Sequence, residues 1–87
     1  MTWKHSPYPV PVLTCPECGT TLLLVEEKSW PIFEQEARSS RCPVVRAILR
    51  DMEFKKPLWI FVLECPSCHR RAIDVFFMSI SYEPYVV

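Results

Sequence analysis

The sequence predicts an α+β fold in which two hairpins form a small antiparallel sheet, with one main helix inserted between them. Two observations carry this prediction. The motif Cys-Pro-x-Cys occurs twice, at Cys15 to Cys18 and at Cys65 to Cys68, and apolar segments of strand length flank each copy. The interval between the copies has the apolar spacing of a helix instead.

The first hairpin is predicted from Val10 to Thr14 and from Thr20 to Glu27, on either side of the first motif. Both segments are short, apolar and bounded by turn or proline signals, which favours strands over helices. Prolines alternate before this hairpin and remove backbone donors on one side. Residues 1–9 are therefore expected to form an extended N-terminal arm.

The middle segment, residues 29–56, is predicted to be a helical insertion. Its apolar residues recur at i, i+3, i+4 and i+7, the spacing of one helical face: Val45, Ile48, Leu49 and Met52. Pro43 suits a first helical turn, so the main helix should run from about Pro43 to Phe54, with Ser39, Ser40 or Cys42 as its cap. A shorter helix could form from Pro31 to Arg38.

The second hairpin is predicted from Leu58 to Glu64 and from Ile73 to Tyr82, which are rich in β-branched and aromatic residues. The run from Leu58 to Leu63 is apolar on both faces, so a helix on one face leaves the other to be covered. Either the arm with Trp3 and Tyr8 covers it, or another protein chain does. We expect a homodimer or a stable protein partner, and a C-terminal tail, residues 83–87, that is loose unless a partner holds it.

Length and composition indicate one domain over residues 1–87. The chain is 49% hydrophobic and 13% aromatic, yet a core of this size is marginal without a staple. Ten Lys and Arg balance ten Asp and Glu, so no global field draws in nucleic acid or an acidic membrane. No signal peptide or membrane-spanning run is apparent, and we expect a soluble, cytoplasmic protein without a membrane partner.

The paired cysteines indicate a metal site that would stabilise this small core. In a reducing compartment, two C-x-x-C units favour metal binding over disulfides, and four thiolates from two tight turns satisfy Zn²⁺. The expected cofactor is therefore zinc, with these ligands: Cys15, Cys18, Cys65 and Cys68. The only glycine, Gly19, follows the first motif where a positive φ is often needed, and His69 holds the matching place in the second.

That equivalence makes a conformational role more probable for His69 than a ligand role. The fifth cysteine, Cys42, precedes Pro43 and is interpreted as a small buried residue or helix cap in preference to a fifth ligand or a nucleophile. A redox pair formed by one of the C-x-x-C units is the weaker alternative, because nothing distinguishes one unit as the active one.

The two C-P-x-C units resemble the knuckles of zinc ribbons and rubredoxin-like modules, in which two hairpins face each other across a metal. The resemblance covers about ten residues around the ligands and the flanking hairpin pattern. It does not cover the long, helix-bearing interval between Cys18 and Cys65, so no specific family follows. It implies a structural zinc site, and it leaves open a rubredoxin-like electron carrier, because four thiolates also hold iron.

A second candidate site is the basic middle of the chain. Six cations outweigh Asp51 and Glu53 between residues 38 and 56, and with two arginines after the second knuckle they could contact phosphates. The candidate contacts to nucleic acid or a partner are Arg38, Arg41, Arg46, Arg50, Arg70 and Arg71. The alternative is an ordinary solvated helix face with an internal ion pair.

The expected function is binding rather than catalysis. No phosphate loop or catalytic triad is present, no small-molecule substrate is evident, and a site of four cysteines leaves no coordination position for water. We rank a protein-interaction or assembly module first. A nucleic-acid-binding or transcription-associated ribbon is the alternative, and the electron carrier is the third hypothesis.

Overall fold

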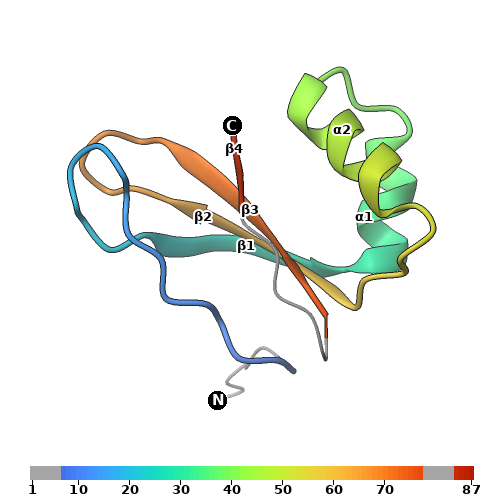
Figure 1. The fold of residues 1–87 in the computed structure, drawn as a ribbon, viewed down its shortest axis with the longest axis horizontal. Helices are drawn as coiled ribbons and strands as arrows, with labels where there is room; N and C mark the ends of the chain where they lie inside the picture. The colour runs from blue at the N-terminus through green and yellow to red at the C-terminus, as the bar shows by residue number, and fades with distance from the viewer. Residues whose placement is uncertain (1–6, 78–83) are drawn as a thin grey trace, which may run out of the picture.

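The computed structural model describes residues 7–77 and 84–87, which form four strands and two helices (Figure 1). Both helices lie between the first two strands in chain order, so the predicted α+β class and the helical insertion are confirmed. In sequence the elements are β1 (Leu23–Ser29), α1 (Trp30–Ala37), α2 (Pro43–Met52), β2 (Trp59–Glu64), β3 (Arg71–Phe76) and β4 (Tyr85–Val86).

The sheet is antiparallel throughout and has the order β1-β2-β3-β4. Strand β2 lies in its interior and is almost fully buried, as its apolar sequence predicts. The pairing of β1 with β2 is interrupted by an irregularity between Leu24 and Glu26, while β2 and β3 pair without a break. The two knuckle turns lie together at one end of the sheet, and the helices lie at the other end (Figure 1).

Both predicted helices are present, and each begins next to a proline. Pro43 is the first residue of α2 and Pro31 the second of α1, where a missing N–H costs no helical hydrogen bond. Cys42 occupies the N-cap position of α2, but its side chain makes no capping hydrogen bond. The main helix ends at Met52, two residues before the predicted end.

The two faces of the sheet carry separate apolar clusters. Alternate residues of β2 and β3 point to the helices and pack with Trp30, Phe33, Ile48 and other helical side chains. The intervening residues form the second cluster with the two buried knuckle cysteines: Cys15, Leu22, Phe61, Leu63, Cys65 and Ala72. The knuckles are therefore built into the core of the second face.

The second face is covered in part by the N-terminal arm. The ring of Tyr8 lies 5.7 Å from Trp59 and 4.8 Å from Phe76, measured between centroids, and Leu13 packs on the same cluster. Trp3, which we expected beside Tyr8, lies outside the described residues. Of the two expected covers for this face, the N-terminal arm and another protein chain, the arm therefore supplies a part through Tyr8.

Three details of the predicted strands differ from the structure. Val10 to Thr14 forms only an isolated bridge between Thr14 and Thr21, because the alternating prolines cannot donate to a ladder. The strand predicted from Thr20 begins instead at Leu23 and runs to Ser29. The tail is not loose, since Tyr85 and Val86 pair with β3. The predicted extension of the last strand to Tyr82 lies partly outside the described residues.

Within the described residues, neither helix has the length and apolar character required to cross a bilayer.

Candidate metal centre

The two knuckles have the same backbone hydrogen bonds. In the first, the N–H of Cys15 donates to the carbonyl of Thr20, and the N–H of Gly19 donates to the carbonyl of Cys15, both at 2.8 Å. In the second, Cys65 donates to Arg70 at 2.8 Å and His69 donates to Cys65 at 2.9 Å. Two copies of one turn therefore present two pairs of sulfurs.

Both turns require a residue with positive φ at the same place. Gly19 has φ +71° and His69 has φ +65°, which places each in the left-handed region. This confirms the equivalence of the two residues inferred from the sequence. The imidazole of His69 does not approach the sulfurs as a ligand, because the compact group of potential metal ligands contains only four cysteines within the described part of the chain.

The structure brings the four predicted ligands into one site. All four sulfurs lie within 4.8 Å of one another, with 3.5 Å between the Sγ atoms of Cys15 and Cys68 and 3.2 Å between those of Cys18 and Cys65. A tetrahedral zinc ion with Zn–S bonds of about 2.3 Å separates its sulfurs by about 3.8 Å. The two shorter sulfur–sulfur distances lie slightly below this value, and the upper limit of 4.8 Å lies above it, so the four cysteines fit a tetrahedral metal ion.

The ligands divide into a buried and an exposed pair. Cys15 and Cys65, the first cysteine of each knuckle, are 2% and 0% exposed and belong to the second apolar cluster. Cys18 and Cys68, the second of each, are exposed. The metal centre thus joins the core on one side and faces solvent on the other.

Hydrogen bonds polarise the thiols. Hydrogen bonding with the hydroxyl and the backbone of Thr20 lowers the pKa of Cys18 to about 6, which favours its thiolate. A backbone hydrogen bond from Arg70 lowers the pKa of Cys68, but hydrogen bonding with the Cys65 and Cys15 thiols outweighs it and raises the pKa to about 11. The two exposed thiols, Cys18 and Cys68, therefore differ in proton affinity, and a bound cation would take all four cysteines as thiolates.

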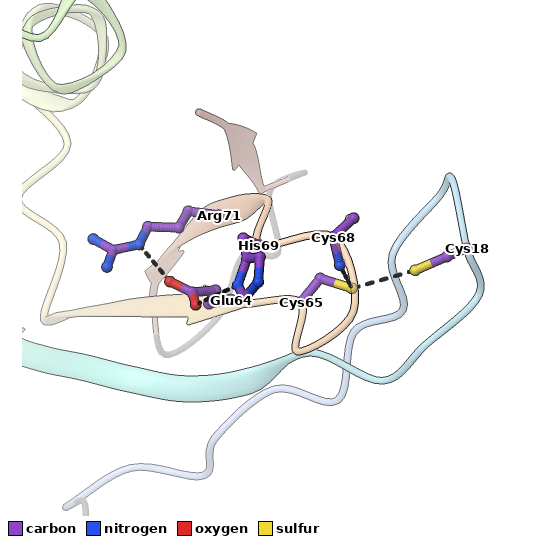
Figure 2. A network of polar contacts seen from close by, with 6 residues as sticks. All are labelled: Cys18, Glu64, Cys65, Cys68, His69 and Arg71. Atoms are coloured by element: carbon purple, nitrogen blue, oxygen red, sulfur yellow. Dashed lines mark hydrogen bonds and ion pairs between the residues drawn. The ribbon is translucent and has the colours of Figure 1, made fainter.

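A polar network supports the second knuckle from its solvent side (Figure 2). Glu64 accepts from Nε of Arg71 at 2.8 Å, and its other oxygen lies 3.5 Å from Nδ1 of His69. Hydrogen bonding with Arg71 and with His69 lowers the pKa of Glu64. The His69 ring is thereby held beside a carboxylate, and the N–H of Cys68 points to Sγ of Cys65 at 3.5 Å.

An ion pair that the sequence analysis did not identify connects the two knuckles. Arg70 and Glu17 approach to 2.6 Å, although they lie more than fifty positions apart in the chain. Four thiolates around a divalent ion carry a net charge of −2, so the cations of Arg70 and Arg71 lie where they offset it. Nothing in the local sequence indicates this pair, because only the meeting of the knuckles creates it.

The candidate contact arginines are divided between the two ends of the molecule. Arg38, Arg46 and Arg50 line one groove between the helices, whereas Arg70 and Arg71 line a hollow beside Cys68. The exposed side chain of Arg41 lines neither. The fifth cysteine, Cys42, also lies apart from the metal ligands, half-buried at the start of α2.

Comparisons with protein-family models, with curated proteins and with solved structures gave no match. The function must therefore be argued from the geometry of the chain itself.

Proposed function

We propose that this protein is a small structural-zinc module that acts through protein–protein association. The metal joins the two knuckles into one core, and an apolar surface beside them binds a second copy of the chain. A closed shell of four thiolates leaves no position for substrate or water, so the centre supports the fold and the chain has no catalytic activity of its own. Free thiolates also favour a reducing compartment, and we place the protein in the cytoplasm.

One observation carries the association proposal: an apolar groove on the second face of the sheet. This groove has a volume of about 420 Å³ and lies between the arm and the C-terminal strand. Its lining is almost entirely apolar: Val12, Leu13, Thr14, Pro16, Leu22, Ala72, Pro84 and Val86. Val12 and Val86 on this lining are 85% and 52% exposed, so the groove presents apolar surface to solvent.

The groove is connected to the metal centre by the backbone. The N–H of Leu22 donates to the carbonyl of Leu13 at 2.8 Å, and Pro16 of the first knuckle forms part of the lining. Loss of the metal would therefore disorder the walls of the groove. A surface that depends on a structural metal in this way suits a constitutive assembly contact rather than a transient one.

The test is the mass of the protein in solution, measured under reducing conditions together with its metal content. We expect twice the 10.2 kDa chain mass and one equivalent of zinc per chain. Val12→Asp should weaken self-association about ten-fold or more, because a symmetric dimer loses the same valine from both copies. The matched control is Ile32→Asp on α1, where an aliphatic side chain of 51% exposure lies away from the groove.

A chain that stays monomeric at high concentration would contradict the association proposal, as would equal effects of the two substitutions. The metal analysis separates zinc from iron. A colourless protein with one zinc excludes the rubredoxin-like electron carrier, whereas a coloured protein containing iron would support it.

A further inference from the structure

The groove between α1 and α2 combines apolar and basic lining residues. It has a volume of about 340 Å³, an apolar floor formed by Ala37 and Leu49, and a rim of three arginines, Arg38, Arg46 and Arg50. Glu53 is its one acidic lining residue. This local excess of positive charge occurs in a chain whose net charge is zero.

The rim arginines are held weakly by the protein itself. The closest approach of Arg38 to Glu34 is 3.7 Å, and that of Arg50 to Asp51 is 3.6 Å, both beyond the length of a good charged hydrogen bond. Asp51 also accepts a hydrogen bond from the Tyr85 hydroxyl at 3.1 Å. Arg46 makes no ion pair with any described residue. These guanidinium groups therefore retain donors for a ligand.

An exposed aromatic residue, Phe54, directly follows Glu53, which lines the same groove. Phe54 is 87% exposed, the most exposed of the large hydrophobic residues in the described part of the chain. Glu53 keeps helical dihedral angles, and the N–H of Lys55 donates to the carbonyl of Met52 at 3.0 Å, so a turn directly after α2 carries Phe54. Arg46 and Arg50 lie four residues apart on α2, and Phe54 follows four residues later in this turn.

We propose that this groove is a binding site for single-stranded nucleic acid, in which the arginines contact phosphates and Phe54 stacks on a base. Cationic side chains beside an exposed aromatic ring are the combination by which proteins bind single strands. A short groove with three arginines suits a few nucleotides, whereas a duplex would present its bases already stacked. The site is separate from the association groove, because the two share no lining residue.

The test uses the metal-loaded full chain and fluorescence anisotropy with a labelled pyrimidine-rich RNA strand of about 12 nucleotides. We expect binding that weakens between about 50 and 200 mM salt, with a slope of log K against log salt near −2, about 0.7 for each of three phosphates. Duplex RNA of the same sequence, polyglutamate and anionic vesicles should each bind at least about ten-fold more weakly.

Two pairs of substitutions separate the contributions of charge and stacking. Arg46→Gln should reduce affinity several-fold and lower the salt slope by about 0.7, whereas Arg41→Gln, an identical change at an exposed arginine that lines neither this groove nor the hollow beside Cys68, should leave both unchanged. Phe54→Leu should reduce affinity about five-fold or more, while Phe54→Trp should preserve it. Each variant side chain is exposed, and an unchanged metal content and melting temperature will show that the fold is intact.

Several results would overturn the proposal. They are absence of binding at low salt, equal losses from Arg46→Gln and Arg41→Gln, or no loss from Phe54→Leu. Polyglutamate binding as tight as RNA binding would reassign the groove to an acidic protein segment, and vesicle binding as tight would reassign it to lipid phosphates.

Discussion

Asp74 is a carboxylate on the apolar second face of the sheet, and we expect its replacement by asparagine to stabilise the protein. It lies on β3 directly opposite Phe61, and Ala72 and Phe76 flank it on the same face. No described residue donates a hydrogen bond to it or pairs with its charge. Desolvation by these apolar neighbours raises its pKa from 3.8 to about 6.

The sign of the effect follows from proton binding in the two states. Between pH 3.8 and about 6 the folded protein holds a proton that the unfolded chain has already released, so stability falls as the pH rises through this window. Above it, the folded protein carries a poorly hydrated charge. A pKa of about 6 in place of 3.8 corresponds to a cost of about 3 kcal/mol, but Asp74 is half-exposed, and screening by solvent reduces our expectation to about 1 to 2 kcal/mol.

The measurement is urea denaturation of the metal-loaded protein and of Asp74→Asn at several pH values. The variant should be more stable by about 1 to 2 kcal/mol at pH 7.5, and the difference should shrink as the pH falls from about 6 toward 4. Taking the difference between the two proteins cancels the acid sensitivity that the metal ligands share. Asp51→Asn is the control: it replaces the exposed carboxylate that accepts from the Tyr85 hydroxyl with a neutral, weaker acceptor, so it should be neutral or destabilising.

The reasoning about Asp74 is refuted if Asp74→Asn is destabilising at pH 7.5, or if its advantage does not depend on pH.

Two further predictions concern the knuckles. Chelation of the metal, or Cys65→Ser, should abolish cooperative unfolding measured by circular dichroism. Structural zinc contributes about 10 to 16 kcal/mol in small domains, which exceeds the usual free energy of unfolding of a fold this size. A chelated protein with an unchanged melting curve would contradict this. His69→Gly should leave the free energy of unfolding unchanged or raise it slightly, whereas Gly19→Ala should lower it by about 1 to 2 kcal/mol, because both positions have positive φ. A Cβ at Gly19 would meet no atom within 4 Å, so the cost lies in the backbone alone. Equal effects of these two substitutions on the free energy of unfolding would show that the turns are not equivalent.

Local patterns were sufficient to predict the helices and the knuckles. Each helix begins beside a proline and follows one apolar face, and both signals lie within a few residues of the element they define. Each knuckle is a closed turn of six residues whose hydrogen bonds begin and end within it. The match of Gly19 with His69 was visible in the sequence because both satisfy the same local dihedral requirement.

Strand limits were predicted less well because they depend on partners. The strand expected from Thr20 is displaced to Leu23–Ser29, where β2 is available to pair with it. The segment Val10 to Thr14 does not form the predicted strand because only one bridge, Thr14 with Thr21, closes beside the prolines. The tail pairs with β3 although its composition gives no strand signal of useful length.

The sequence by itself determined the α+β class, the helical insertion and the four cysteines as a group able to hold a metal ion, because spacing and local dihedral preference specify all three. Only the tertiary structure decided how distant residues meet. It brought Glu17 to Arg70 across the two knuckles, and it divided the arginines, placing Arg46 and Arg50 in a groove between the helices, at the other end of the sheet from the knuckles. Such contacts depend on how the sheet positions its two ends, and no local pattern encodes them.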